Sequence, residues 1–386
     1  MSGSESDAWV AWSAIAEPLD PAAAALLAVL GPVEALAWLR ECVGRPQAAL
    51  AGLIERVGPD VEPRSLARIV RSASTWGRRL DRADPAMHRH RCAAVGGYVL
   101  TPADDGWPEA VHALGAAAPM ALYVRGGPLR SVLEGSIALV GSRAATAYGS
   151  HVAAEIAAGV VADDRTVVSG GAFGIDAAAH RSAIAAGGRT VAIMAGGVDR
   201  WYPAGTASLR DDVLRNGCVV SEVPPGSAPH RSRFLSRNRL IACAAATVVV
   251  EAAYRSGALS TAHHAMEIAR PVGAVPGPVT SAASAGAHRL IRELGAVLVT
   301  SAADVLELVK PLDAVPQPVD PDTTGPIAFA SREQRAAYDA IPRGGSALDQ
   351  ISTEGSLELG DTRRALAGLV AAGKVSYEGG IYRRIL

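Results

Sequence analysis

Lysine is nearly absent from this chain, and cysteine is scarce. Only Lys310 and Lys374 are lysines, so arginine supplies the rest of the 37 basic residues among 386. Arginine binds phosphate as a planar fork and stacks on bases, but codon usage in a GC-rich genome produces the same bias. The four cysteines form no CxxC pair, which argues against a disulfide framework and against a cysteine zinc site. They are Cys42, Cys92, Cys218 and Cys243.

Long hydrophobic runs are also missing from the sequence, although 49% of the residues are hydrophobic. No apolar run approaches the roughly 20 residues that a membrane-spanning helix needs. The first twenty residues contain acids early and lack the basic n-region of a signal peptide. We therefore expect a soluble, cytoplasmic protein with no membrane contact. Because the net charge is −1, any nucleic-acid binding must come from a local basic patch.

Composition divides the chain into four segments. Residues 1–90 contain Ala/Leu-rich stretches separated by Gly-Pro and Arg-Pro pairs, which predicts a helical domain. Residues 91–310 predict an extended α/β domain. The Pro- and Asp-rich stretch 311–326 predicts a linker. Residues 327–386 predict three short helices and a hairpin with a Gly-Gly turn, which is the element order of a winged helix.

The fold class follows from a pattern of short β-branched runs that alternate with amphipathic helical stretches. Such runs specify a parallel sheet that is covered on both faces. The sequence therefore predicts an α/β fold with a doubly wound, Rossmann-like parallel sheet. A helix is expected near 234–245. The predicted strands are 137–141, 166–169, 190–194, 218–221, 247–251, 272–275 and 296–299, with shorter candidates at 98–100 and 122–124.

The most informative segment is PHRSRFLSRNRL, residues 229–240. It places four arginines around one aromatic residue, Phe234, with Asn238 beside them and no acidic residue inside the run. Four cations so close together repel one another unless an anion lies among them. A phosphate backbone supplies that anion, and an aromatic face stacks an unpaired base. An arginine-rich surface helix is the alternative interpretation.

Small and hydroxyl residues follow several predicted strands. Residues 141–143 follow the first strand, 169–174 the second and 255–257 the fifth, while the arginine run follows the fourth. In an open parallel sheet, ligands bind beyond the carboxyl ends of the strands. Backbone N–H groups and helix N-termini hold anions there. One edge of the sheet is therefore predicted to collect phosphate-binding backbone, arginines and an aromatic platform.

Nucleotide enzymes are less well supported. Neither glycine segment is G-x-G-x-x-G, and Ser169 stands where a dinucleotide site needs an acid for the ribose. The second hypothesis is a Rossmann-like nucleotide phosphoribohydrolase of the lysine-decarboxylase-like type. Its PGGxGTxxE motif would fall near residues 255–261, which have no double glycine and no matching glutamate.

Two histidine patterns could carry other chemistry. Asp176 and His180 are four residues apart on one predicted helix, either as an acid–base pair or as a surface or packing pair. His88, His90 and Cys92 have a metal-like spacing, but no fourth ligand is evident. We expect neither a metal nor a cofactor.

Seven motifs occur in order between about 95 and 310. They are GSR at 141–143, SGGAFGIDAAAH at 169–180, WYP at 201–203, SEVPPG at 221–226, HRSRFLSRNR at 230–239, VVEAAYRSGALSTA at 249–262 and VPGPVTSAASAG at 275–286. Together they resemble the DNA-processing protein A (DprA, also called Smf) family. The flanking helical and winged-helix segments fit the layout of that family, although residues 1–90 lack the glycine-rich hairpin of a helix-hairpin-helix segment.

The resemblance implies a homodimer that binds and protects incoming single-stranded DNA and loads the RecA recombinase in natural transformation, without catalytic turnover. In an organism that is not transformable, the pathway would be another recombination or repair process. The resemblance implies that Arg143, Arg231, Phe234, Arg237 and Asn238 line the DNA groove, and that Ser169, Gly170, Ser256 and Gly257 contribute to its phosphate pocket. Secondary candidates are Ser142, Arg233, Arg239, Ser260 and Thr261.

Overall fold

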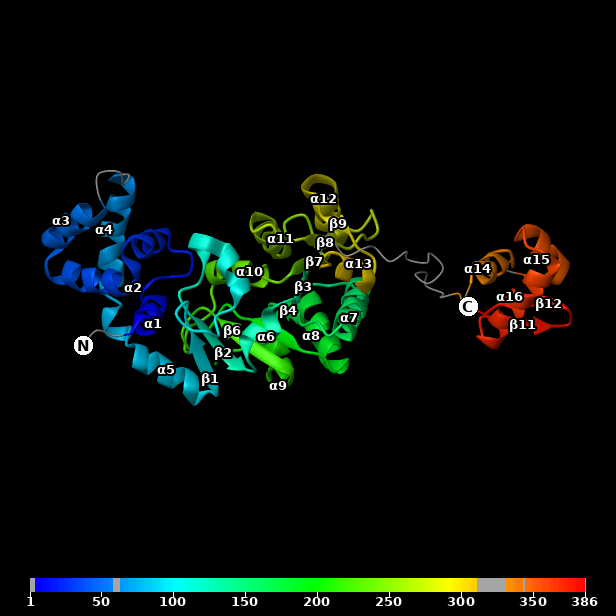
Figure 1. The fold of residues 1–386 in the computed structure, drawn as a ribbon, viewed down its shortest axis with the longest axis horizontal. Helices are drawn as coiled ribbons and strands as arrows, with labels where there is room; N and C mark the ends of the chain where they lie inside the picture. The colour runs from blue at the N-terminus through cyan, green and yellow to red at the C-terminus, as the bar shows by residue number, and fades with distance from the viewer. Residues whose placement is uncertain (1–3, 58–62, 311–328, 330, 343, 386) are drawn as a thin grey trace. The chain divides into compact units, whose positions relative to one another are not determined.

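The protein forms two compact units, Met1–Lys310 and Pro311–Leu386. Figure 1 shows the elements of each unit in chain order. The computed structural model describes residues 4–57, 63–310, 329, 331–342 and 344–385. The predicted linker at 311–326 lies outside the described residues.

The chain begins with a layer of helices. Its elements are α1 (Glu5–Ile15), α2 (Pro21–Gly44), α3 (Pro46–Val57), α4 (Pro63–Gly77), a 3-10 turn (Leu80–Arg82) and α5 (Pro85–Ala94). Helices α2 and α5 each start with an Asp-Pro pair, because the aspartate accepts hydrogen bonds from the first turn and proline fits the first helical position. In the core of the layer, the rings of Trp12 and Trp76 meet edge to face with their centroids 5.5 Å apart.

Helix α2 is a long apolar helix of 24 residues. By length and composition it is the one helix of the described residues that could cross a membrane. It bends at Gly31, where φ is 67°, and half of its most apolar stretch is buried inside the protein. The indole Nε1–H of Trp12 donates to the carbonyl of Pro32 at 3.1 Å. A buried core helix of a globular protein meets the same length and composition test.

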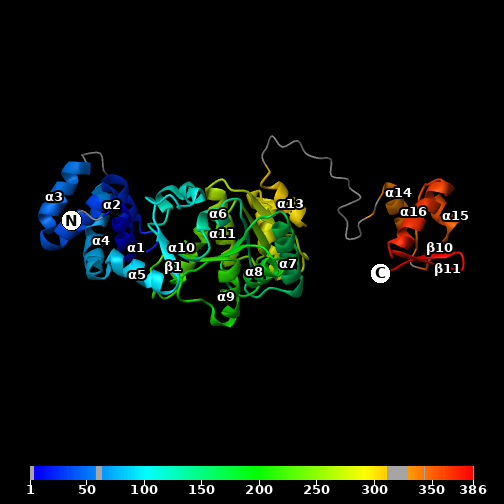
Figure 2. The ribbon, with the colours of Figure 1, turned by 60° about the horizontal axis from the view of Figure 1, so that its bottom comes forward.

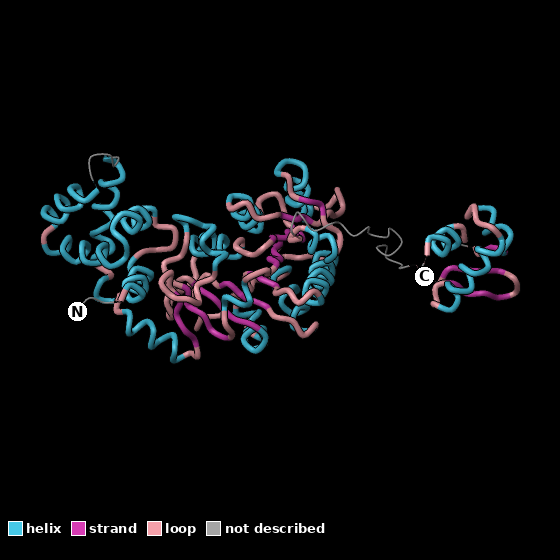
Figure 3. The backbone as a smooth tube through the Cα atoms, in the orientation of Figure 1, coloured by secondary structure: helices cyan, strands magenta, loops and turns pink. Residues whose placement is uncertain are grey.

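A nine-stranded sheet forms the centre of the larger unit. Figure 3 shows its strands in magenta among the helices. Its strands are β1 (Gly97–Leu100), β2 (Leu122–Gly126), β3 (Ile137–Gly141), β4 (Val167–Ser169), β5 (Thr190–Ile193), β6 (Gly217–Ser221), β7 (Ala246–Glu251), β8 (Val272–Ala274) and β9 (Val297–Leu298). The spatial order is β1-β2-β6-β5-β4-β3-β7-β8-β9. Strands β3 to β9 are parallel, which confirms the predicted α/β fold class. The short candidates at 98–100 and 122–124 become β1 and β2, which add an antiparallel extension beside β6.

Helices cover the sheet, and Figure 2 shows them from a second direction. They are α6 (Leu129–Leu133), α7 (Ala147–Ala162), α8 (Ile175–Ala185), α9 (Ser208–Asn216), α10 (Arg231–Ile241), α11 (Gly257–Glu267), α12 (Ala285–Leu294) and α13 (Ala302–Glu307), with 3-10 turns at Glu109–Ala117, Ala204–Thr206 and Ala282–Ser284. Because strand side chains alternate between faces, Leu139 packs in the core that α7, α8 and α13 complete. Its neighbour Val140 packs in the core that α6, α10, α11 and α12 complete.

The strand order reverses at β3. From β3 the chain proceeds through β4, β5 and β6 on one side, and then returns to β7, β8 and β9 on the other. Loops after two adjacent strands therefore leave in opposite directions and open a crevice, which is where doubly wound folds bind ligands. Helix α10 starts at Arg231 rather than near residue 234 as predicted, so the arginine run lies in the helix beside this crevice.

The smaller unit has three helices and a hairpin, together with a short strand, β10, that the sequence did not predict. It contains α14 (Arg332–Asp339), β10 (Ser346–Ala347), α15 (Leu348–Glu354), α16 (Leu359–Ala371), β11 (Val375–Glu378) and β12 (Ile381–Arg384). Its three strands are antiparallel in the order β10-β12-β11. Gly379 and Gly380 join β11 to β12 with φ values of 58° and 86°, a conformation that a tight hairpin turn requires and glycine adopts readily.

Candidate functional site

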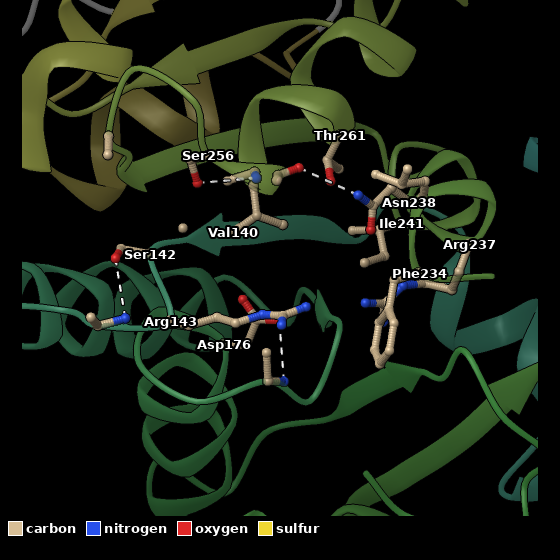
Figure 4. Close-up of a pocket in the computed structure, with 17 residues that line it drawn as sticks. Val140, Ser142, Arg143, Asp176, Phe234, Arg237, Asn238, Ile241, Ser256 and Thr261 are labelled. Atoms are coloured by element: carbon tan, nitrogen blue, oxygen red, sulfur yellow. Dashed lines mark hydrogen bonds between the residues drawn. The ribbon is translucent and has the colours of Figure 1, made fainter. Parts of the chain in front are cut away.

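A pocket of about 450 Å³ lies at the carboxyl ends of β3 and β7, in the crevice where the strand order reverses. Its walls come from the loop after β3, the loop after β7, the start of α11 and one side of α10 (Figure 4). Predicted binding residues that line it are Ser142, Arg143, Phe234, Arg237, Asn238, Ser256, Gly257 and Thr261. The pocket thus brings together residues from three motifs that are far apart in the sequence.

Arg143 and Phe234 form the mouth of the pocket. The guanidinium carbon of Arg143 lies 5.3 Å from the centroid of the Phe234 ring, and Figure 4 shows the two side chains facing each other. Arg143 is exposed, and no carboxylate of the described residues lies within ion-pair distance of it. The Tyr202 ring lies on Phe234 as well, with centroids 5.5 Å apart. The site therefore offers an unpaired cation and an aromatic surface side by side.

The start of α11 forms the opposite wall. Ser256 caps this helix by accepting a hydrogen bond from Ala258 N–H at 3.3 Å. The amide of Asn238 donates to the carbonyl of Gly257 at 3.3 Å, which ties α10 to α11 across the pocket floor. A helix N-terminus carries a partial positive charge, so this wall favours an anion. Ser260, in the same turn, is half-buried and does not line the pocket.

At the start of α7, a carboxylate of the protein occupies the place where an anionic ligand could bind. Glu251, at the end of β7, accepts hydrogen bonds from Thr146 N–H at 2.9 Å and from the Thr146 hydroxyl at 2.8 Å. A Cβ on Gly149 would collide with this carboxylate. In dinucleotide-binding folds a pyrophosphate occupies the corresponding helix start, and here such a group would meet the negative charge of Glu251.

Ser169 and Gly170 do not line the pocket, although both were predicted to contribute to a phosphate pocket; from the loop after β4, Ala172 lines it instead. The buried Ser169 hydroxyl donates to the Leu139 carbonyl at 2.6 Å. The carboxylate of Asp176 accepts hydrogen bonds from Gly170 N–H at 3.1 Å and Ala172 N–H at 3.3 Å. The backbone donors that a phosphate would need are therefore already engaged, and these two residues shape the pocket from below.

Arg237 is a buried cation under the pocket. Its Nη1 donates to the carbonyls of Gly170 (2.9 Å) and Ile193, and its Nε has no partner among the described residues. Burial lowers the pKa of Arg237 to about 10, and the Asp176 carboxylate opposes this shift. Burial also raises the pKa of Asp176, which the Arg237 charge and the two backbone N–H groups oppose. Arg237 thus remains charged at neutral pH but presents little surface to a ligand.

The arginines of α10 mostly have internal partners. Arg239 is 2% exposed, its two Nη atoms bond the two Glu222 oxygens at 2.7 and 2.6 Å, and its Nε donates to Ala117. Arg233 pairs with both oxygens of Glu17 at 3.0 and 3.1 Å. These secondary candidates therefore hold the fold together, and the anions that relieve their repulsion are carboxylates of the protein. Arg231 alone among the four is exposed, with no ion pair among the described residues.

His180 is a packing histidine rather than half of an acid–base pair. It is fully buried, its Nδ1 lies 2.7 Å from the Thr190 hydroxyl, and its Nε2 has no partner among the described residues. Burial, aided by the Arg237 charge, lowers the pKa of His180 to about 4. It therefore stays neutral at physiological pH. The described residues hold no group of three His, Cys, Asp or Glu side chains arranged for a metal ion, and His88 bonds the carbonyl of Arg82 instead.

The buried His180 should make stability depend on pH. Below the ordinary histidine pKa of 6.5 the unfolded chain takes up a proton, whereas the folded protein does not until about pH 4. The free energy of unfolding should therefore fall as pH drops through this window, by about 2 kcal/mol at roughly pH 5. Asp176, with its raised pKa, acts in the opposite direction. Urea denaturation of wild type and His180→Leu isolates the histidine, because the variant should lose this slope. Parallel profiles for the two proteins would contradict the assignment.

Sequence reasoning missed three aromatic residues beside the pocket. Trp201 and Tyr202 belong to a motif that was noted without a role, and Phe173 lies in the loop after β4. The available signal was their position, because each follows the carboxyl end of a strand in the sheet half that carries the pocket. The glutamates that pair with the α10 arginines gave no such signal.

The chain resembles DNA processing proteins over most of its length. The family model described as DNA recombination-mediator protein A matches residues 98–310. A putative DNA processing protein DprA of Mycobacterium tuberculosis is 41% identical over 389 aligned residues, which cover 97% of this chain and 93% of that protein. The DNA processing protein DprA of Streptococcus pneumoniae is 40% identical over 190 residues, 49% of this chain and 66% of that protein.

A solved structure supports the same relationship. The X-ray structure of DNA processing protein A (DprA) from Streptococcus pneumoniae superposes with a TM-score of 0.57 and 32% identity, covering 71% of this chain and 96% of that one. The family match spans the whole sheet and both walls of the pocket, and the mycobacterial relative extends it to nearly every residue. On these grounds the chain belongs to the DNA recombination-mediator protein A family, the DprA/Smf proteins.

Proposed function

We propose that this protein binds single-stranded DNA in the pocket between β3 and β7. The observation that carries the proposal is the unpaired guanidinium of Arg143 beside the ring of Phe234, 5.3 Å from its centroid. A nucleotide matches this pair, with its phosphate on the cation and its base on the ring. Every base has a π-face, so little sequence preference is expected. In a duplex both faces of a base are already stacked, so the unpaired strand is favoured.

The phosphate contacts come from a small set of groups. Arg143 is an exposed cation that lines the pocket, and the α11 start with Ser256 and Gly257 supplies a further anion-binding wall. Arg231, exposed at the start of α10, is outside the lining and would reach only a strand that extends beyond the pocket. Asn238 positions that wall through its hydrogen bond to Gly257. Because the whole chain has a net charge of −1, attraction of the strand depends on this patch and weakens as salt screens it.

The wider role rests on the family. We extend the proposal to a cytoplasmic homodimer that protects incoming single-stranded DNA and loads RecA in transformation or another recombination process. The 1–90 segment would act as a helical domain, and the C-terminal unit, with three helices and a hairpin, as a winged helix. Absence of catalytic turnover is part of the proposal. It is supported by Asp176, whose carboxylate is occupied by two backbone N–H groups instead of a reacting partner.

Fluorescence anisotropy with labelled oligo-dT and with a duplex of equal length tests the proposal at two salt concentrations. We expect the wild type to prefer the single strand, with an affinity that falls as salt rises. Phe234→Ala should weaken binding by about 1–3 kcal/mol, the value of one stacked base. Val29→Ala on α2 is the control, because it removes an exposed apolar side chain that does not line the pocket.

Two outcomes would overturn the proposal. Absence of oligo-dT binding at low salt would remove the DNA-binding function. Binding that Phe234→Ala weakens no more than Val29→Ala does would place the strand elsewhere on the protein. Release of a free base from a nucleoside monophosphate would instead favour the phosphoribohydrolase hypothesis.

A further inference from the structure

Two large aromatic side chains lie exposed beside the pocket without an assigned role. Phe173 in the loop after β4 and Tyr202 in the loop after β5 are each 46% exposed. The chain contains only three phenylalanines, and two of them, Phe173 and Phe234, lie at this rim. An exposed aromatic ring contributes less to the stability of the fold than a buried one, because its apolar surface remains in water. Placing scarce phenylalanine at such a position therefore points to a ligand that covers it.

The rings continue the aromatic surface of the pocket. Tyr202 contacts Phe234 with centroids 5.5 Å apart. The Phe173 ring lies over Gly205, three residues beyond Tyr202, at a spacing where an added Cβ would come within 2.7 Å of its Cζ. Ala172, the neighbour of Phe173, lines the pocket itself. The surface thus leads from Phe234 across the loop after β5 to Phe173, without leaving the edge of the sheet.

The supporting loops hold these rings in place. The Trp201 indole N–H donates to the Thr206 hydroxyl at 3.0 Å, and that hydroxyl lies 3.1 Å from the carbonyl of Gly171. The indole also packs on Gly171, where a Cβ would lie 3.4 Å from its Cζ2. The loops after β4 and β5 are therefore bound to each other. A pre-positioned ring loses little conformational entropy when a base stacks on it.

We propose that Phe173 and Tyr202 form a second base-stacking platform, over which the DNA strand leaves the pocket. This inference rests on the proposed function, because the occupant is the same strand whose first base stacks on Phe234. Phe173 has no polar atom to recognise a base edge, and Tyr202 has one hydroxyl, so stacking is sequence-tolerant here too. The platform extends the site by at least one nucleotide beyond the 450 Å³ pocket.

The test separates the contribution of the bases to the affinity from that of the phosphates. Affinities are measured for oligo-dT and for an abasic oligomer of the same length, which keeps the phosphates but has no bases to stack. Phe173→Ala should weaken oligo-dT binding about tenfold and leave the abasic oligomer within about twofold. Val29→Ala on α2, which removes a side chain that is 51% exposed on the helical layer, is the control and should change neither affinity.

A second variant displaces the ring without removing it. Gly205→Ala would displace the Phe173 ring, because the added methyl group would collide with it. Gly205 is exposed, so the fold can accommodate the methyl group. It should lower oligo-dT affinity in the same direction as Phe173→Ala. If Phe173→Ala and Gly205→Ala both bind oligo-dT as the wild type does, while Phe234→Ala weakens it, the platform is refuted and the proposed function stands. If the wild type does not bind oligo-dT, the proposed function itself fails.

Discussion

Alanine in place of Arg239 is expected to reduce the free energy of unfolding by about 3–5 kcal/mol, as removal of one partner of a buried ion pair does. Arg239 is 2% exposed and bonds both oxygens of Glu222, at 2.7 and 2.6 Å. Without it, Glu222 becomes a buried carboxylate that has lost its cation. The Ala117 carbonyl, which accepts from Arg239 Nε at 2.6 Å, also loses its donor. Urea denaturation followed by circular dichroism measures the change.

The same helix offers the control. Arg231 is exposed and has no ion pair among the described residues, so Arg231→Ala should change stability by less than about 0.5 kcal/mol. Combining Arg239→Met with Glu222→Leu replaces the pair by apolar side chains and should restore much of the loss. Equal stabilities for Arg239→Ala and Arg231→Ala would mean that the buried pair does not hold α10 in place.

The double variant Arg143→Ala/Phe234→Ala should bind single-stranded DNA roughly a hundredfold more weakly than the wild type. One lost base stack costs about 1–3 kcal/mol, and one lost contact to a charged group adds about 1.5 kcal/mol or more. A hundredfold change corresponds to about 2.8 kcal/mol. Arg143 is exposed and Phe234 half-buried, so the fold should tolerate both changes. Anisotropy with labelled oligo-dT at fixed salt measures the effect.

The two single variants should not add up to the double variant. Because the Arg143 guanidinium lies over the Phe234 ring, loss of either side chain releases the other, with a coupling of about 0.5–1 kcal/mol. Arg189→Ala is the control, since this arginine pairs with Asp164 away from the pocket. A double variant that binds as well as Arg189→Ala would exclude the pocket from DNA binding.

The fold was largely predictable because its signal is local. Strands β3 to β7 are short, almost fully buried runs with β-branched residues between helical stretches, and parallel strands buried on both faces need such runs. The pairing of β2 with β6 was not predictable, because Leu122 to Gly126 shows no feature that selects a strand partner almost a hundred residues away. The start of α10 was also misplaced, since His230 gives no capping side chain to mark it.

The site was predictable only in part, because two arginines of α10 pair with glutamates that are distant in the sequence. Counting the arginines of α10 suggested four cations awaiting an external anion. Two of the anions are Glu17 and Glu222, and Glu17 lies 216 positions before its partner Arg233. No local pattern reveals such a pair. Phe173 was overlooked for a related reason, because its exposure depends on how the loops after β4 and β5 meet.

The helical layer and the sheet also share buried contacts. Val10 of α1 belongs to the same core as strands β2, β5 and β6, and the Ser13 hydroxyl lies 2.9 Å from the Tyr123 hydroxyl in the interior. Glu17, just after α1, holds Arg233 on the helix that carries Phe234. Unfolding of α1 would thus uncover the sheet residues that pack on it and would leave Arg233 on α10 without its carboxylate partner. We therefore expect the N-terminal helices to unfold together with the sheet, and an exchange of these helices to require repacking of the sheet behind the pocket.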